Sequence, residues 1–281
     1  MNTRIGLLGI FGIWLTMAMM PLAELMQLNA NQLLVLRGLP AVVILGLAAT
    51  IPRYRISMPD RNTILFAFFF VVACLGLFQG IKAWGASLSA VLLDMAVLVN
   101  FFFAAVRKEK IGVANLMLFG TAIAGSFLAL RAWDAGNINV TGLLWSLVAL
   151  VANGLGIEYG SRAQQDNQTK AFWQSVALST VGFAFSGTSP LDIRSHWLMA
   201  LVFGISTGLL NFLSAFVAFK NLKPTWTGTL VLGVTPWILI GSWFITGKIL
   251  GLDQMLGVGV VICSVGTLAY LLGKKKSPKM A

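Results

Sequence analysis

Apolar residues gather in ten runs along the chain, and short polar connections separate these runs. A helix that crosses a membrane needs about 20 residues, most of them apolar, and each run approaches that length. The connections contain Arg, Lys, Asn and Asp, which are typical of loops. The pattern predicts an all-α membrane protein with ten transmembrane helices, over residues 4–24, 31–51, 63–81, 85–106, 111–131, 139–162, 170–187, 197–219, 225–246 and 254–273.

The composition agrees with a membrane protein. Of the 281 residues, 58% are hydrophobic and 10% are charged, whereas soluble domains contain about 25% charged residues. The net charge of +11 does not indicate a nucleic-acid partner, because the basic residues are spread over many short loops. We therefore expect the lipid bilayer as the surroundings of this chain, and no nucleic acid.

The distribution of Lys and Arg predicts the orientation of the helices. When the loops are assigned to alternate sides, 15 of the 20 basic residues fall on one side and 4 on the other, and Arg37 lies inside a helix. Cytoplasmic loops carry the excess of positive charge. Both termini are therefore expected in the cytoplasm.

Five helices in each half give the two halves opposite orientations in the membrane. The expected halves are residues 1–134 and residues 135–281, the second ending in a basic cytoplasmic tail. A shift of 138 residues aligns 75–111 with 213–249 and pairs two lysines of the first segment with lysines on the opposite side. Inverted five-helix repeats of this kind indicate a secondary transporter, which holds its substrate near the middle of the membrane.

Ionisable side chains lie inside the expected helices, where charge is costly and marks either function or a buried pair. Asp94 lies near the middle of its helix, where it could bind a substrate amine, carry a proton or tie helices together. Glu158 could be a second such site or could pair with Arg162, four residues further on. Arg37 could clamp a substrate carboxylate or pair with Glu24 at the end of the preceding helix.

Uncharged polar and aromatic residues also lie inside the expected helices. Amides there most often form interhelical hydrogen bonds, and indoles most often pack, but both could contact a small ligand. The amides are Gln79, Asn100, Asn153 and Asn211, and the deep indoles are Trp14 and Trp237.

Proline and glycine mark positions where helices bend or approach closely. Pro21, Pro40 and Pro236 remove helix hydrogen bonds and permit either a hinge or a static kink. Glycines recur in 111–131 and 254–273, which lets helices approach closely and could also mark the face of a homodimer.

The sequence resembles the drug/metabolite transporter superfamily, specifically its ten-helix EamA-type exporters, over essentially the whole chain. The residues that carry the resemblance are KAWGASLSAVLL at 82–93, RKEKI at 107–111 and a second copy within 220–249. Pro236 stands where the family commonly has a mid-helix proline, whereas the first copy has Leu98 there.

The resemblance implies a carrier in the bacterial inner membrane that exports small metabolites, often amino acids or amphiphilic compounds. It also implies a central cavity surrounded by the helices that carry Gln79, Asn153 and Asn211. With Trp14, Asp94, Glu158 and Trp237, these residues form the candidate substrate site.

These features favour a secondary transporter that exports a small zwitterionic or cationic metabolite by alternating access. The candidates are acids, amides and indoles rather than clustered Lys and Arg, which an organic phosphate would require. No GxxxxGK[ST] nucleotide-binding motif is present.

An intramembrane enzyme and a non-transporting receptor or assembly factor are the alternatives. The single histidine, His196, falls in an outer loop, so we expect no catalytic residue, metal or cofactor.

Overall fold

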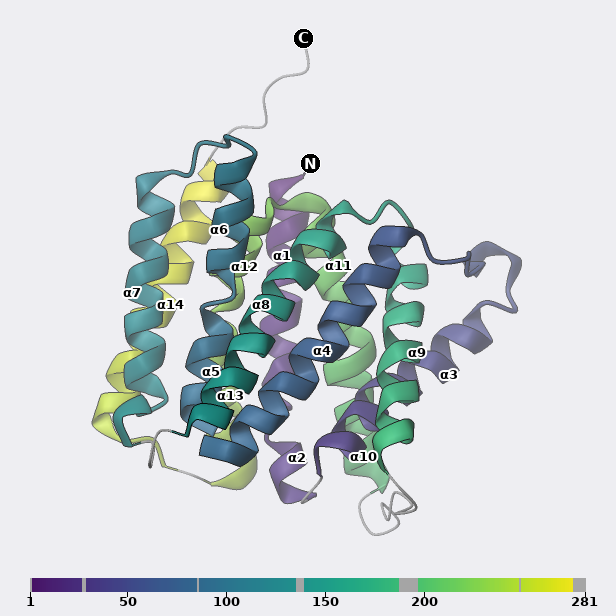
Figure 1. The fold of residues 1–281 in the computed structure, drawn as a ribbon, viewed down its shortest axis with the longest axis horizontal. Coiled ribbons are helices and arrows are strands. Elements are labelled where there is room, and N and C mark those ends of the chain that lie inside the picture. The colour runs from purple at the N-terminus through teal and green to yellow at the C-terminus, as the bar shows by residue number, and fades with distance from the viewer. Residues whose placement is uncertain are drawn as a thin grey trace.

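The computed structural model describes residues 2–26, 29–84, 86–134, 139–186, 197–247 and 249–274, so His196 lies outside the described residues. Within these ranges the chain is helical and contains no β-strand (Figure 1). The helices are α1 (Thr3–Met17), α2 (Leu22–Leu25), α3 (Ala30–Ala48), α4 (Arg61–Trp84), α5 (Ala86–Asp94), α6 (Val97–Val106), α7 (Val113–Ala129), α8 (Val140–Arg162), α9 (Asn167–Ser186), α10 (Trp197–Gly204), α11 (Asn211–Asn221), α12 (Pro224–Val231), α13 (Val234–Thr246) and α14 (Leu252–Lys274). A π-helix, η4 (Ile205–Leu210), joins α10 to α11.

Seven spans of the described chain are long and apolar enough to cross a membrane, which indicates a multi-pass membrane protein. They are Asn31–Ala48, Arg61–Gly80, Ser89–Val106, Val140–Arg162, Trp197–Asn221, Pro224–Thr246 and Leu252–Lys274. The other three runs of the sequence also form helices. Two of these, α1 and α7, are apolar but shorter, and α9 has 20 residues of more polar composition.

Several helices that the sequence predicts as continuous are interrupted. Residues 85–106 form α5 and α6 with a break at Met95 and Ala96, and residues 225–246 form α12 and α13 with a break at Leu232 and Gly233. At both breaks the backbone N–H groups bond to carbonyl oxygens three residues earlier, as in a tightened turn. Each segment is nonetheless long and apolar enough to cross a membrane as one span, from Ser89 to Val106 and from Pro224 to Thr246.

The three prolines lie in different kinds of backbone. Pro236 lies in the first turn of α13, where a missing N–H costs nothing and the fixed φ favours a helix start. Pro21 lies in the turn between α1 and α2, so the first predicted helix ends at Met17 rather than near residue 24. Pro40 lies inside α3, which continues through it. Whether these positions act as hinges stays a prediction.

The helices pack in pairs that place glycine at the closest approaches. The main pairs are α4 with α8, α1 with α11, α3 with α9, and α7 with α14. A Cβ on Gly76 of α4 would lie 2.8 Å from the carbonyl oxygen of Trp145, and one on Gly9 of α1 would lie 2.7 Å from that of Ser214. Since these contacts are backbone against backbone, no larger residue fits without moving a helix.

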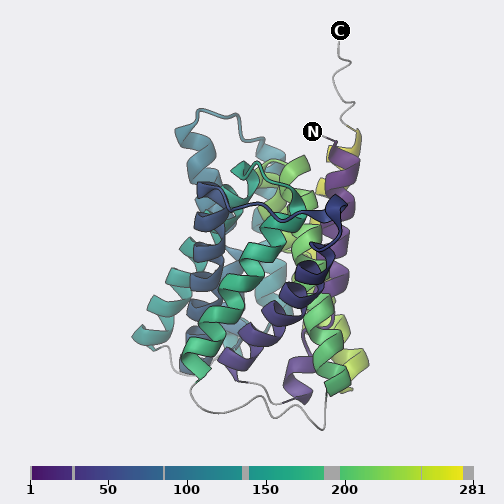
Figure 2. The same cartoon turned by 90° about the vertical axis from the view of Figure 1, so that its right-hand side faces the viewer.

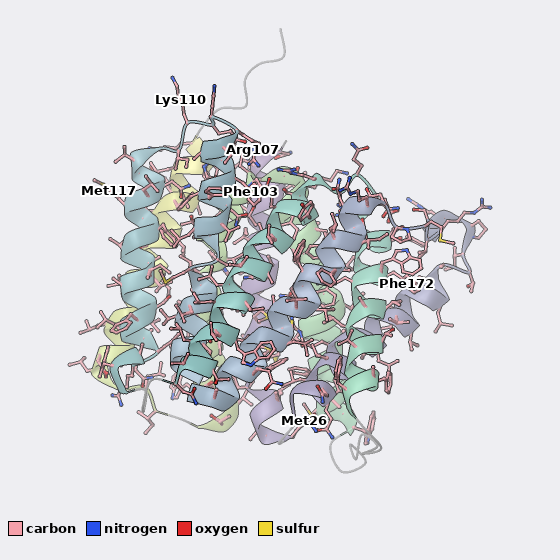
Figure 3. The ribbon with its side chains drawn as sticks, in the orientation of Figure 1. Met26, Phe103, Arg107, Lys110, Met117 and Phe172 are labelled. Carbon is pink, nitrogen blue, oxygen red and sulfur yellow. The ribbon has the colours of Figure 1, made fainter. Side chains whose placement is uncertain are left out.

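The start of α1 and the end of α14 lie at the same end of the helix bundle, and both views show them close together (Figures 1 and 2). The loop that carries Arg107 and Lys110 also lies at this end (Figure 3). The start of α1, the end of α14 and this basic loop thus share one end of the bundle, and the cytoplasmic location of that end stays a prediction.

Gly257 and Gly259 of α14 offer a matched test of the contact with α7. A Cβ on Gly257 would lie 2.6 Å from the carbonyl oxygen of Gly125, whereas one on Gly259 meets no atom within 4 Å. Gly257→Ala is expected to push the helices apart at a cost of about 1–3 kcal/mol. Gly259→Ala is expected to be neutral or to stabilise the protein by up to about 1 kcal/mol, because Ala has a higher helix propensity than Gly. Thermal unfolding in detergent measures both variants, and an equal loss in the two contradicts the close contact.

Candidate functional site at the two helix breaks

The carboxylate of Asp94 joins the two helix breaks. Asp94 is the last residue of α5, and its Oδ2 accepts a hydrogen bond of 3.0 Å from the hydroxyl of Thr235, in the first turn of α13. The Ser126 side chain of α7 is a second hydroxyl close to this carboxylate. A negative charge is disfavoured at the C-terminus of its own helix and favoured at the N-terminus of another. The start of α13, rather than the end of α5, therefore favours a negative charge at Asp94.

The second break is held by Trp14 of α1. Its indole N–H donates a hydrogen bond of 3.0 Å to the carbonyl oxygen of Leu230, in the last turn of α12. The indole ring lies so close to Gly233 that a Cβ there would be 2.5 Å from Trp14 Cε2. The N–H of this predicted substrate contact is thus occupied by the backbone, which leaves only its ring face for a ligand.

Asn100 of α6 is the polar side chain with the greatest unused hydrogen-bonding capacity near this site. Its exposed fraction is 0%, and neither its amide nitrogen nor its amide oxygen has a hydrogen-bond partner among the described residues. A Cβ on Gly228 of α12 would lie 3.3 Å from Asn100 Nδ2. Buried amides in proteins are normally hydrogen-bonded to protein groups or to ordered water. The amide of Asn100 can therefore still form hydrogen bonds with a water molecule or a ligand.

Arg37 bonds to the π-helix η4, and Asn211 is the residue that follows η4 in the chain. The Nε and Nη2 atoms of Arg37 both donate to the carbonyl oxygen of Thr207 at 3.3 Å, and the guanidinium lies 5.7 Å from the ring centres of Phe70 and Phe212. Asn211 donates to the hydroxyl of Thr16 at 3.0 Å. These two predicted site residues are therefore engaged in helix contacts.

The predicted alternative for Arg37 was an ion pair with Glu24. The backbone of Glu24 lies in α2, but its side chain lies outside the described residues. Arg37 is buried and has no carboxylate within 4.0 Å among the side chains that are described. The pairing with Glu24 and the carboxylate clamp both stay predictions.

Glu158 belongs to a charge cluster that consists of Glu158, Arg107, Arg162, Glu109 and Lys223. Its Oε1 accepts hydrogen bonds from both Arg107 and Arg162, the latter at 2.5 Å from Nη2. Arg107 also bonds to Glu109 at 2.6 Å, and Lys223 lies 3.7 Å from Glu109. The hydrogen bond from Arg107 holds the pKa of Glu109 below its ordinary value, so this carboxylate stays ionised at neutral pH.

The pair of Glu158 with Arg162, one of the two alternatives for Glu158, is present. Arg107 is the partner that the sequence did not identify. Glu158 is 2% exposed, and its second oxygen is buried without a hydrogen-bond partner in the described part of the chain. Glu158 lies near the end of α8, at the end of the bundle where the loop after α6 lies, and so it is separate from the Asp94 site.

The remaining residues that were predicted to contact substrate lie away from the two helix breaks or in helices beside them. Gln79 is exposed near the end of α4, and Asn153 is partly exposed on α8 beside Gly154, which packs against α6. Trp237 of α13 packs edge-on against Phe11, with ring centres 6.3 Å apart. Of the candidate substrate contacts, the structure brings Trp14 and Asp94 to the two breaks.

The fold is similar to that of a protein of known crystal structure whose description names no activity. The TM-score is 0.81 and the sequence identity is 17%, over 97% of this chain and 100% of the other. At this identity the similarity shows the fold alone. No protein-family model matches the sequence, and no curated protein matches it.

Glu158 and Glu109 of the charge cluster allow the stability contributed by a buried carboxylate to be compared with that of a partly exposed one. Glu158→Gln leaves Arg107 and Arg162 without their shared partner, and because both arginines reach water we expect a loss of about 1–3 kcal/mol, below the 3–5 kcal/mol of a fully buried pair. Glu109→Gln, at a carboxylate that is 30% exposed, is expected to cost below about 1 kcal/mol. Thermal unfolding of both variants is the measurement. A larger loss for Glu109→Gln contradicts this ranking.

Proposed function

We propose that this chain is a secondary transporter of ten membrane-crossing helices in two inverted five-helix repeats, and that it exports a small zwitterionic or cationic metabolite by alternating access. The proposal includes membership of the EamA-type exporters and a bacterial inner-membrane location. The observation that carries it is the carboxylate of Asp94, which joins two helix breaks from opposite halves of the chain.

The order of the helices supports the inverted repeat. The described α-helices of the first half have counterparts about 138 residues later: α1 and α2 together with α8, α3 with α9, α4 with α10–α11, α5–α6 with α12–α13, and α7 with α14. The contacts follow the same rule, since α4 packs on α8 as α11 packs on α1, and both α3–α9 and α7–α14 pair each helix with its own counterpart. The two breaks, at Met95 and at Leu232, also correspond.

Broken helices that meet inside a membrane are a recurrent way to build a transport site. They supply helix ends and polar backbone at a depth where lipid offers no hydrogen bonds. Here the site contains a carboxylate with one hydroxyl donor, so a substrate ammonium group or a proton is the complementary ligand. The unused amide of Asn100, about six residues and roughly 9 Å further along the helix axis, can bind a second polar group of a larger ligand or a water molecule.

The charge cluster would close one end of such a carrier. Arg107 and Glu109 belong to the first half of the chain, whereas Glu158 and Lys223 belong to the second. Opening a path to that end between the halves would separate these pairs. Energy for transport would come from an ion or substrate gradient, because the sequence has no nucleotide-binding motif.

Asp94→Asn tests the carboxylate without changing its size. A thermal-shift screen with amino acids and amines first identifies a ligand that stabilises the purified protein. A hydrogen bond to a charged group contributes about 1.5–3 kcal/mol, so Asp94→Asn is expected to weaken this binding, and proteoliposome flux of the same compound, about 10- to 150-fold.

The matched control is Asp253→Asn, at a partly exposed carboxylate that pairs with Arg131 at the start of α14. This variant is expected to keep wild-type flux. Equal flux in Asp94→Asn and the wild type, at every pH tested, refutes the assigned role of Asp94. Ligand binding without flux in the wild type favours a receptor, and turnover of the ligand favours an enzyme.

Asn100→Leu separates a ligand contact from a structural amide. Replacing a buried amide that has no described partner removes an unfavourable desolvation of about 1–3 kcal/mol, so the melting temperature is expected to stay the same or rise. Flux is expected to fall, because the polar contact is lost. Asn211→Leu is the comparison, since its amide is bonded to Thr16, and this variant is expected to lower the melting temperature. A loss of stability in Asn100→Leu contradicts the assignment.

A further inference from the structure

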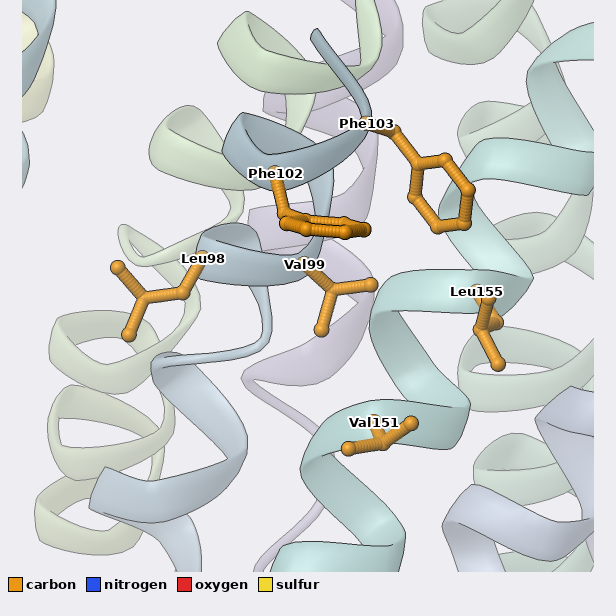
Figure 4. A pocket seen from close by; sticks show the side chains of 6 residues that line it. All are labelled: Leu98, Val99, Phe102, Phe103, Val151 and Leu155. Carbon is orange, nitrogen blue, oxygen red and sulfur yellow. The ribbon is translucent and has the colours of Figure 1, made fainter. Parts of the chain in front are cut away.

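A shallow apolar groove of about 430 Å³ lies between α6 and α8 (Figure 4). Leu98, Val99, Phe102 and Phe103 line it from α6, and Val151 and Leu155 line it from α8. None of these side chains has a polar atom. The groove therefore offers only apolar contact to whatever occupies it.

The groove opens on the outer surface of the helix bundle. Phe102 is 64% exposed, Val151 is 47% exposed and Leu98 is 41% exposed. In a multi-pass membrane protein, an exposed apolar surface on a spanning helix faces lipid chains. The hydrocarbon chain of a lipid is thus the occupant that reaches the groove without crossing a polar region.

Both walls of the groove lead to basic residues at the same end of the bundle. On α6, Arg107 follows Phe103 by about one helical turn, and the labelled side chains lie one above the other (Figure 3). Lys108 and Lys110 are exposed in the following loop, and Arg162 ends α8 beyond Leu155. Glu109 and Glu158 neutralise two of these four cations, which leaves a net positive charge at the end of the bundle to which α6 and α8 lead.

Lys108 has a backbone conformation that few lysines adopt. Its φ is 55°, in the left-handed region that favours glycine. A residue kept in an unfavourable conformation is a reason to look for a function of its side chain. Here Lys108 lies in the turn at the start of the basic loop that follows α6.

We propose that the groove between α6 and α8 binds one acyl chain of an anionic membrane phospholipid, whose phosphate group contacts Lys108 and Lys110. The groove supplies a place for the chain, and the basic loop supplies selectivity for the anionic head group. This inference depends on the chain spanning a membrane and is independent of the transport proposal.

Native mass spectrometry of the full-length protein tests the proposal, with phosphatidylglycerol and phosphatidylcholine of identical acyl chains as the probes. The wild type is expected to retain phosphatidylglycerol at least about fivefold over phosphatidylcholine, from the attraction of an anionic lipid to basic residues. The double variant Lys108→Gln/Lys110→Gln is expected to lose this preference. Arg53→Gln/Arg55→Gln, which removes two exposed cations from the loop between α3 and α4, is the matched control and is expected to keep it.

A bulky side chain in the groove tests the acyl-chain contact separately. Val151→Trp is expected to lower the retention of both lipids. Leu144→Trp is the control, because Leu144 is also exposed on α8 but lies outside the groove, and it is expected to have no effect. Excess inorganic phosphate is expected not to displace the lipid, since it cannot fill the groove.

Four results concerning the anionic head group would overturn the proposal. They are equal retention of the two lipids by the wild type, no effect of the double lysine variant, an equal loss in the Arg53→Gln/Arg55→Gln control, and displacement by inorganic phosphate. The last result identifies a free-anion site in place of a lipid site. If Val151→Trp retains both lipids as the wild type does, this result also contradicts the proposed position of the acyl chain.

Discussion

A helix that is interrupted inside a membrane exposes backbone groups that lipid cannot satisfy, so the protein itself must supply their partners. The centre of this structure depends on that constraint. At the break after α12, tightened backbone bonds are supplemented by the Trp14 indole, which donates to the Leu230 carbonyl oxygen. At the other break, α5 ends in Asp94, whose Oδ2 accepts a hydrogen bond from Thr235 in the first turn of α13. Each break thus relies on a side chain from another part of the sequence.

The hydrophobic pattern was sufficient to locate the helices but not their interruptions. Helix positions follow from run length and flanking polar residues, which are local properties of the sequence. Pro236 marks the beginning of α13, yet no proline or glycine marks the break after Asp94. The close neighbour of that break, Gly154 of α8 beside the Ala96 carbonyl oxygen, is distant in the sequence. In the charge cluster, Arg162 could be found from its spacing to Glu158. Arg107 could not, since it lies 51 residues away.

Burial and bonding separate residues that the sequence treats as equivalent. Asn100 and Asn211 are both amides within apolar helices, but Asn211 is bonded to Thr16 while both polar atoms of Asn100 lack a described partner. Arg37 is likewise bonded to the π-helix. Polar groups that are fully engaged hold helices together, and those with unused capacity are where water or a ligand lowers the free energy of the protein.

This distinction makes the two broken helices chemically different under the proposed inverted repeat. In α12, the hydroxyls of Thr227 and Thr229 are already bonded to backbone carbonyl oxygens one turn earlier. Asp94 and Asn100, along the α5–α6 segment, have capacity to bind a further group. Proline, in contrast, lies only in the α12–α13 segment, as Pro224 at the start of α12 and Pro236 in the first turn of α13. Under the proposed transport function, the α5–α6 segment would therefore supply the ligand-binding carboxylate and amide, whereas the α12–α13 segment would supply the Thr235 hydroxyl that bonds to Asp94.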